Sequence, residues 1–185
     1  MKRNITTLLL RALCSIFAGC KKDKTDTPLT ELEKLPPITQ TGANTFGCLV
    51  DGVAWLPNGS RPQYGGPNPD VYVDPTFQGG HFGITAHQYK NFQSQVGFGS
   101  GQYTNGGVYD IGLPLQSISY TRFLNTLNTC EFSSFDPGTY RRGFFNISRY
   151  DLANGIFSGT FESTIKSQAC GDTIRITNGR FDVKL

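Results

Sequence analysis

The 185-residue chain has little charge, and its charges almost cancel. Only 17% of the residues are charged, and the formal net charge is +3. Three of the 17 basic residues, Lys2, Arg3 and Arg11, precede Cys20, which leaves 14 basic and 14 acidic residues after that cysteine. Nucleic-acid binding requires a basic surface that neutralises phosphate groups. We therefore expect no nucleic acid among the partners of this chain.

Histidine and long apolar runs are also scarce. After the first twenty positions the chain has no uncharged apolar run of about 18 residues, which is the length that a membrane-spanning helix needs. The only two histidines are His81 and His87. Six residues along a strand would separate them by about 20 Å, whereas zinc ligands converge within about 2.0–2.3 Å of one ion. We expect no metal site.

Catalytic motifs are missing as well. Gly97, Gly99 and Gly101 surround Ser100, but Gln102 stands where both the dinucleotide-binding and the nucleophile-elbow patterns require glycine. The acidic residues are spread thinly and lie mostly beside glycine or proline, where they form turns. We expect no catalytic residue and no cofactor.

Turn residues and alternating apolar residues are what the chain does have. It contains 22 glycines and 10 prolines, and from Asn44 onward β-branched and aromatic residues recur with a period of two. Asp51-Gly52 and Asn178-Gly179 are typical of two-residue hairpin turns. The expected strands cover residues 46–50, 53–56, 71–73, 82–89, 92–98, 108–113, 118–123, 145–150, 156–165, 174–176 and 181–183. About ten to twelve strands with short turns predict an all-β fold, either an antiparallel β-sandwich or a lipocalin-like β-barrel.

The first twenty residues are typical of a secretion signal. Lys2 and Arg3 form a basic start, an apolar stretch follows, and Ala18-Gly19-Cys20 resembles a bacterial lipobox. We expect residues 1–19 to be a lipoprotein signal peptide and Cys20 to carry the lipid anchor that attaches the protein to a membrane. The alternative is an ordinary signal peptide with an incidental cysteine. Because no acidic run follows Cys20, we expect an outer-membrane lipoprotein that faces the periplasm.

Residues 20–43 are predicted to be a tether between the lipidated cysteine and a single β-rich domain at 44–185. The segment is polar, and its positive and negative charges balance. Thr27-Pro28 could start a short helix that Pro36-Pro37 would end. So short a helix is marginal in water unless it docks, so we expect a disordered spacer. Such a spacer could hold the domain several nanometres from the bilayer.

Several longer blocks support a family resemblance. They are Leu35-Pro36-Pro37, NTFGCLVDG at 44–52, Trp55, DPT at 74–76, Gly79-Gly80, CEF at 130–132, IFSGTFE at 156–162 and DTIRITNGRFD at 172–182. From about Leu35 to its end, the chain resembles an uncharacterised family of Bacteroidetes lipoproteins. The resemblance implies an envelope location and a β-rich fold. It implies no activity and no catalytic residue.

Five cysteines are present, and three remain once Cys14 leaves with the leader and Cys20 is acylated. The oxidising envelope permits one disulfide, for which three pairings are open. We favour Cys130 with Cys170, because both adjoin turn-rich segments. Cys48 shares a strand face with apolar residues and is expected to be a buried thiol.

Aromatic residues in or beside the predicted loops are candidates for a ligand surface. Such side chains can stack on sugar rings or anchor a protein partner, and the alternative is that they belong to the core. The candidates are Trp55, Tyr64, Tyr72, Tyr103 and Tyr109.

Three functional hypotheses follow. The first is a non-enzymatic binding or structural module at the outer membrane, with a glycan or an envelope protein as its partner. The second is a polysaccharide-acting hydrolase that uses acidic residues such as Asp70 and Asp74. The third is a barrel that carries a small apolar ligand.

Overall fold

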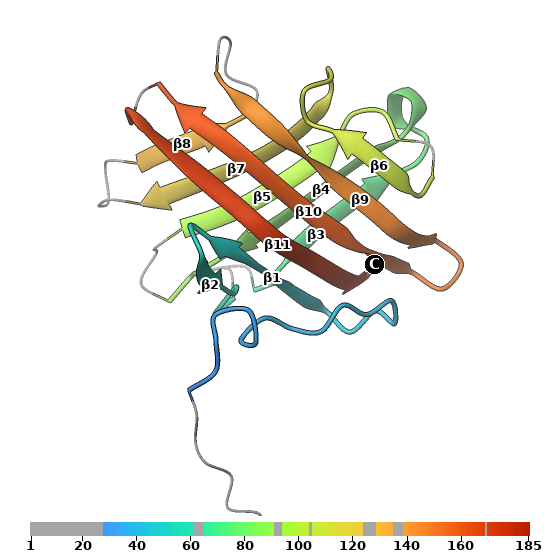
Figure 1. The fold of residues 1–185 in the computed structure, drawn as a ribbon. Coiled ribbons are helices and arrows are strands. Elements are labelled where there is room, and N and C mark those ends of the chain that lie inside the picture. Colours follow the sequence, from blue (N-terminus) through green and yellow to red (C-terminus); the bar gives the residue numbers. More distant parts are fainter. Residues whose placement is uncertain are drawn as a thin grey trace, which may run out of the picture.

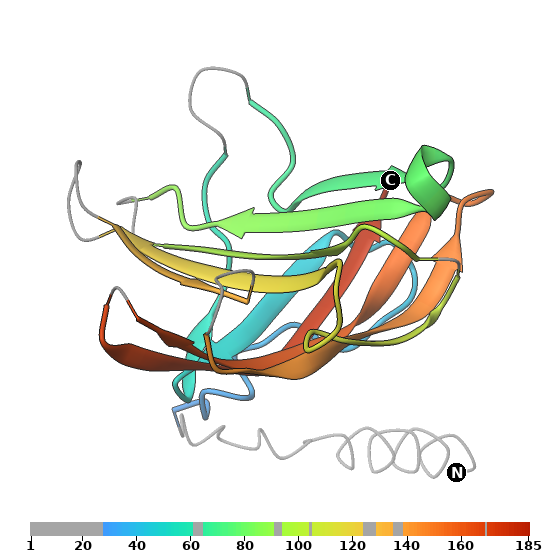
Figure 2. The same ribbon diagram turned by 90° about the horizontal axis from the view of Figure 1, so that it is seen from above.

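Two antiparallel sheets pack face to face in the computed structural model, which describes residues 28–60, 65–90, 94–103, 105–123, 129–134, 139–168 and 170–185 (Figures 1 and 2). Among these residues there are eleven strands, and no pairing joins the edge strands of one sheet to those of the other. The predicted antiparallel β-sandwich is confirmed, and the alternative of a closed barrel is wrong. None of the helical segments in the described ranges is long and apolar enough to cross a membrane.

The sheet that faces the viewer in Figure 1 has six strands in the order β2-β1-β11-β10-β9-β6, and we call it the front sheet. Its strands are β1 (Thr45–Val50), β2 (Val53–Trp55), β6 (Gly107–Asp110), β9 (Arg141–Asp151), β10 (Ile156–Ser167) and β11 (Asp172–Lys184). The back sheet has five strands in the order β3-β4-β5-β7-β8. They are β3 (Asp70–Asp74), β4 (His81–His87), β5 (Ser94–Ser100), β7 (Gln116–Phe123) and β8 (Thr129–Ser133), with a single 3-10 turn, η2 (Phe77–Gly79), before β4.

Alternation of side chains between the two faces of each sheet builds the core. In β4, Phe82, Ile84 and Ala86 are buried between the sheets, whereas the residues between them are only partly buried. Phe98 of β5 lies at the centre, with its ring 4.6 Å from that of Phe161 in the front sheet. The space between the sheets is therefore filled by aromatic side chains, and the hypothesis of an internal apolar ligand loses its basis.

Two glycines give the aromatic core its close strand contacts. Gly159 of β10 lies opposite Phe181 of β11, and Phe161 lies opposite Gly179 in the same pair of strands. A Cβ atom at Gly159 would lie 2.8 Å from atoms of the Phe181 ring, and a Cβ atom at Gly179 would lie 2.6 Å from the Phe161 ring. Each ring thus covers the backbone of the glycine opposite it, which a side chain at that position would prevent.

The Asn178-Gly179 pair forms a β-bulge, and the predicted hairpin at this position is wrong. Strand β11 continues through the pair, and Asn178 has a φ of 53°. The register shifts in both neighbouring strands, between Gly47 and Leu49 of β1 and between Phe161 and Ser163 of β10. Two residues of β11 therefore lie opposite one residue of each neighbour, as in a bulge that uses a left-handed residue.

Residues 36–43, which we call the strap, cross the outer face of the front sheet and are not a free spacer (Figure 2). The side chain of Asp182 is only 1% exposed, although β11 turns it away from the core. Its carboxylate accepts hydrogen bonds from Thr41 N at 2.9 Å, Gly42 N at 2.8 Å and Thr39 Oγ1 at 2.6 Å. The predicted boundary at residue 44 is therefore wrong, because a buried carboxylate ties the strap to the domain.

A single helical turn precedes the strap. The Thr30 N–H donates to Glu33 Oε2 at 2.8 Å, and the Glu33 N–H donates back to Thr30 Oγ1 at 3.3 Å. This reciprocal pair is a capping box, so the turn begins at Thr30. Thr27 of the helix start considered from the sequence lies outside the described residues. The turn docks on β2, because the Ala54 N–H donates to Glu31 Oε2 at 2.8 Å.

The disulfide joins Cys130 with Cys170, which is the pairing favoured from the sequence. Cys130 belongs to β8 in the back sheet, and Cys170 lies between β10 and β11 of the front sheet. The bond therefore links the two layers of the sandwich. Cys48 is a buried free thiol in the core, as expected.

Candidate functional site

Two of the predicted ligand-surface residues are buried, so their assignment to a binding surface is wrong. Trp55 is 4% exposed, and its Nε1–H donates to Ser94 Oγ at 2.7 Å. Tyr103 is 3% exposed, and its hydroxyl donates to the Tyr150 hydroxyl at 2.9 Å. Both rings face the space between the sheets, where their polar atoms have partners within the protein.

The remaining candidates are not brought together. Tyr72 lies on the outer face of β3 in the back sheet and is 53% exposed. Tyr109 belongs to β6 of the front sheet, where its ring stacks on Phe145 with centroids 5.2 Å apart. Tyr64 and the predicted lipid anchor Cys20 lie outside the described residues.

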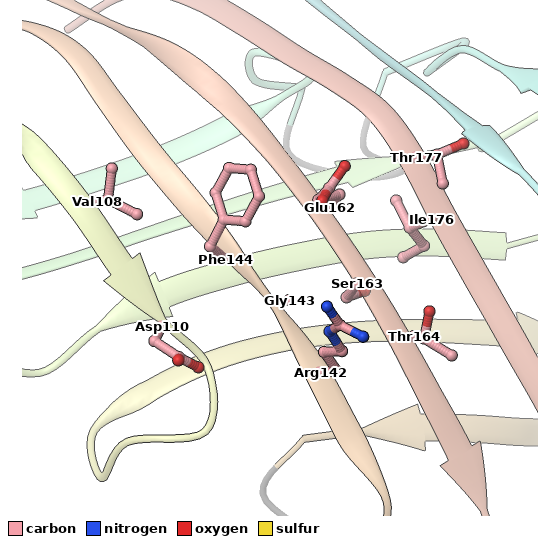
Figure 3. Close-up of a pocket in the computed structure, with 10 residues that line it drawn as sticks. All are labelled: Val108, Asp110, Arg142, Gly143, Phe144, Glu162, Ser163, Thr164, Ile176 and Thr177. Carbon is pink, nitrogen blue, oxygen red and sulfur yellow. The ribbon is translucent and has the colours of Figure 1, made fainter.

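A broad hollow lies on the outer face of the front sheet, over β6, β9, β10 and β11 (Figure 3). Its volume is about 530 Å³, and we call it the front depression. The side chains that line it and matter for its chemistry are Val108, Asp110, Arg142, Phe144, Glu162 and Thr177. Sites for small ligands commonly have volumes of about 300–1,000 Å³, so the front depression has room for a small ligand.

Close approach of two strands forms the floor of the front depression. Gly143 of β9 has a φ of 149° and lies opposite Ser163 of β10. A Cβ atom at Gly143 would lie 2.2 Å from the carbonyl oxygen of Glu162, so no other residue fits this backbone position. A glycine inside a strand is the sequence signal for such an approach.

Phe144 places an aromatic ring on the outer face of the front sheet. Its neighbour Phe145 is buried in the core, and successive strand residues point to opposite faces. Phe144 is therefore directed outward, and Figure 3 shows its ring between Val108 and Glu162. Glu162 is its direct partner across β9 and β10. The adjacent Phe144-Phe145 pair could have identified this outward ring from the sequence.

Uncompensated charged groups surround the ring. Arg142 lies opposite Thr164 across the same pair of strands and is exposed. Among the described residues, neither Arg142 nor Glu162 forms a hydrogen bond or an ion pair through its side chain. Asp110 accepts a hydrogen bond from the Gly112 N–H at 2.7 Å. The front depression thus offers a ring, free donors and free acceptors on one face.

The strap forms the wall of a smaller hollow that adjoins the front depression. This hollow has a volume of about 180 Å³ and shares Phe144 and Glu162 with its neighbour, while Ile38 of the strap and Arg180 of β11 line its other side. Arg180 Nη1 donates to the carbonyl oxygen of Pro36 at 3.2 Å. The strap therefore positions Ile38 beside the same aromatic ring.

Electrostatics hold the strap in place. Burial alone would raise the pKa of Asp182, but hydrogen bonds from Ser158, Thr39 and the backbone of the strap outweigh it. The pKa of Asp182 consequently lies well below its usual range, and the carboxylate stays ionised at neutral pH.

The carboxylates Asp70 and Asp74 do not meet the requirement for a glycosidase pair. They lie at the two ends of β3, four residues apart, and this corresponds to about 13 Å along a strand. Glycosidases use carboxylates about 5–10 Å apart. The Asp74 carboxylate instead accepts hydrogen bonds from Thr76 Oγ1 and Thr76 N, which lower its pKa and shape the turn after β3.

A second hollow of about 250 Å³ lies on the outer face of the back sheet. Gly83, Gly97 and Gly99 form part of its floor, and His81 stands at its edge with its ring 5.6 Å from that of Tyr72. The lining offers hydroxyl groups but, unlike the front depression, no Arg, Lys, Asp or Glu side chain. The back-sheet hollow is therefore smaller than the front depression and has fewer charged groups that could bind a ligand.

The geometry defines an all-β sandwich with an open, mixed polar and aromatic hollow on one outer face. Within the described residues, no group of three or more His, Cys, Asp or Glu side chains is placed to hold a metal ion. Comparisons with protein-family models, curated proteins and solved structures find no match to this chain.

Proposed function

We propose that this protein is a non-catalytic lipoprotein of the bacterial envelope that binds glycans in the front depression. The observation that carries the proposal is the outward ring of Phe144 beside the free side chains of Arg142 and Glu162. A ring that served only packing would be expected on the core side, where Phe145 lies.

The chemistry of the front depression suits a sugar. The face of an aromatic ring is electron-rich and attracts the C–H groups on the face of a pyranose. Sugar hydroxyls both donate and accept hydrogen bonds, and Arg142 and Glu162 supply the complementary donors and acceptors. Because both signs of charge are present, the site favours a neutral, polar ligand over a polyanion or an apolar molecule.

The openness of the site to solvent along the sheet also favours an extended ligand. Strands β9, β10 and β11 run side by side beneath the front depression, and the smaller hollow at Ile38 continues it (Figure 1). A second sugar unit could occupy that hollow. The proposed ligand is therefore an oligosaccharide or a polysaccharide segment.

The proposed location in the cell envelope depends on Cys20 and on the signal-like first nineteen residues. The resemblance to Bacteroidetes lipoproteins supports the same address. Mass spectrometry of the purified chain tests it, because diacylation of Cys20 adds a defined mass that a Cys20→Ala variant cannot carry.

Binding to a glycan panel tests the ligand. Phe144→Ala should weaken binding by about three- to tenfold, since an aromatic contact contributes about 0.5–1.5 kcal/mol. Arg142→Ala and Glu162→Gln should weaken it as well. The control is Phe77→Ala, which removes an exposed ring outside the front depression, beside His81 at the edge of the back-sheet hollow.

Two results would reject the proposal. Wild-type protein that binds no glycan would remove the ligand. Release of reducing ends from a bound polysaccharide would replace the binding role with hydrolysis, and Glu162→Gln would then have to abolish the release.

A further inference from the structure

Exposed apolar side chains gather where the strap and its helical turn meet the edge strand β2. Leu29 and Val53 are each 61% exposed, and Leu32 and Leu56 are exposed as well. The Ala54 N–H to Glu31 hydrogen bond holds the turn against β2, so these side chains lie along one edge of the front sheet, with Leu56 beside Gly47 on the outer face and Val53 on the same face as Trp55. We call Leu29, Leu32, Val53 and Leu56 the β2 patch.

The β2 patch is held on an ordered base. A Cβ atom at Gly47 would lie 2.8 Å from Leu56 Cδ2 and 2.9 Å from Pro36 Cδ, so Leu56 and the start of the strap pack on the same point of β1. The capping box at Thr30 and Glu33 fixes the turn that carries Leu32. Exposed apolar groups on such a fixed base mark a contact surface.

The length of chain that leads to Cys20 identifies what covers the patch. Because the strap is docked, only the seven residues 21–27 separate Cys20 from Pro28, where the described chain begins. The eight steps from Cys20 to Pro28 span at most about 29 Å when fully extended. Acyl chains on Cys20 would therefore keep the β2 patch close to the bilayer surface at all times.

We propose that the β2 patch rests on the phospholipid surface to which Cys20 is anchored. This inference depends on the lipid anchor of the proposed function but not on glycan binding. Tethering makes the contact intramolecular, so four side chains with little intrinsic affinity are enough to orient the domain. Residues 21–34 carry balanced charges, so the contact depends on apolar groups and should be insensitive to salt.

The resulting orientation directs the ligand site away from the membrane. In the front sheet, β2 is one edge and β6 is the opposite edge. Neighbouring strands lie about 4.8 Å apart, so the five steps from β2 to β6 amount to roughly 24 Å. With the β2 patch on the bilayer, the front depression at β6, β9 and β10 is open to large glycans.

Spin labels on the acylated chain in vesicles of phosphatidylethanolamine and phosphatidylglycerol test the orientation. Labels are introduced by Leu32→Cys and Val53→Cys in the patch, and by Val108→Cys and Leu152→Cys as exposed controls elsewhere. Cys48 is buried and stays unlabelled. The patch labels should lose collisions with a water-soluble nickel relaxer and gain collisions with oxygen, whereas the control labels should do neither. The same labels on the unanchored Cys20→Ala chain give the fully accessible reference.

Other outcomes of the labelling experiment would each reject a different claim. Equal accessibility at all four labels would reject the orientation while leaving glycan binding intact. Protection of Val108→Cys in place of the patch would place the front depression against the bilayer and reject both the orientation and glycan binding on the membrane. A mass without acyl groups on Cys20 would reject both the envelope location and the contact of the β2 patch with the membrane. As a second variant, Leu32→Ser with Leu56→Ser should restore nickel access at Val53→Cys on vesicles, and an unchanged label would contradict the apolar contact.

Discussion

Ser158 and Asp182 lie directly opposite each other on β10 and β11, and the Ser158 hydroxyl donates a hydrogen bond of 2.6 Å to Asp182 Oδ1. Both side chains are on the outer face of the front sheet, beneath the strap. The same carboxylate accepts hydrogen bonds from the backbone of Thr41, Gly42 and Ala43. One ionised group thus fixes a segment about 140 residues away in sequence, and this segment forms a wall of the candidate site.

Asp182→Asn should detach the strap and lower the free energy of unfolding by about 2–4 kcal/mol, since hydrogen bonds to a charged group contribute about 1.5–3 kcal/mol each. Amide hydrogen exchange should accelerate at Thr41, Gly42 and Ala43, whose N–H groups lose their acceptor. The control is Asp172→Asn, at an exposed residue whose carboxylate bonds only locally. Unchanged exchange in the strap would contradict the role of Asp182.

Stability should fall in acid. Because the pKa of Asp182 is lowered in the folded state, its contribution is complete above the unfolded value of about 3.9 and is lost as the pH falls towards the folded value. Urea unfolding from about pH 5 down to pH 2 should show this decline. Asp182→Asn should flatten the profile, and a variant with the same slope as wild type would exclude Asp182 as a source.

Removal of the disulfide should destabilise the sandwich without changing its topology. Cys130 and Cys170 are 40 residues apart, for which the chain-entropy relation gives about 4 kcal/mol. Cys130→Ala with Cys170→Ala should lower the urea midpoint, and reductant should do the same to the wild type. Cys48→Ala should keep the sensitivity to reductant. A midpoint that does not respond to reductant would contradict the inter-sheet bond.

Gly159→Ala should lower the free energy of unfolding by about 1–3 kcal/mol, which is the usual cost of overpacking a core. The new methyl group would lie 2.1 Å from the Asn146 carbonyl oxygen and 2.8 Å from the Phe181 ring. Gly83→Ala is the matched control, because a Cβ atom there meets nothing within 4 Å. It should be neutral or stabilising by up to about 1 kcal/mol. Equal effects in thermal unfolding would show that Phe181 does not cover Gly159.

The fold could be predicted from the sequence wherever alternation is local. Strand β4 follows its apolar period closely, and Asp51-Gly52 forms the hairpin between β1 and β2. In β11 the Asn-Gly pair suits both a hairpin and a bulge, and the partner strands on both sides of β11 favour the bulge. Strand β8 is not among the expected strands, although its buried residues Cys130 and Phe132 alternate with polar ones. The docking of the strap cannot be predicted from a local pattern, because its partner Asp182 is remote in sequence.

The candidate site was harder to predict. Aromatic side chains near loops can point either way: Trp55 of β2 lies on the core face with Cys48, and Tyr103, in the loop after β5, also packs into the core. The informative signals were Gly143 and the adjacent pair Phe144-Phe145, which together indicate close strand approach and one outward ring. The grouping of Arg142 with Glu162 depends on the register between β9 and β10, which local pattern does not determine.

Backbone chemical shifts of the domain, recorded during titration with a glycan that it binds, test the central claim most directly. The account predicts that the perturbed amides cluster at Arg142, Phe144, Glu162, Thr164 and Thr177, on the outer face of the front sheet. Amides of β4 and β5 at the floor of the back-sheet hollow should stay unchanged. Perturbations centred on Gly83, Gly97 and Gly99, with none around Phe144, would contradict the account.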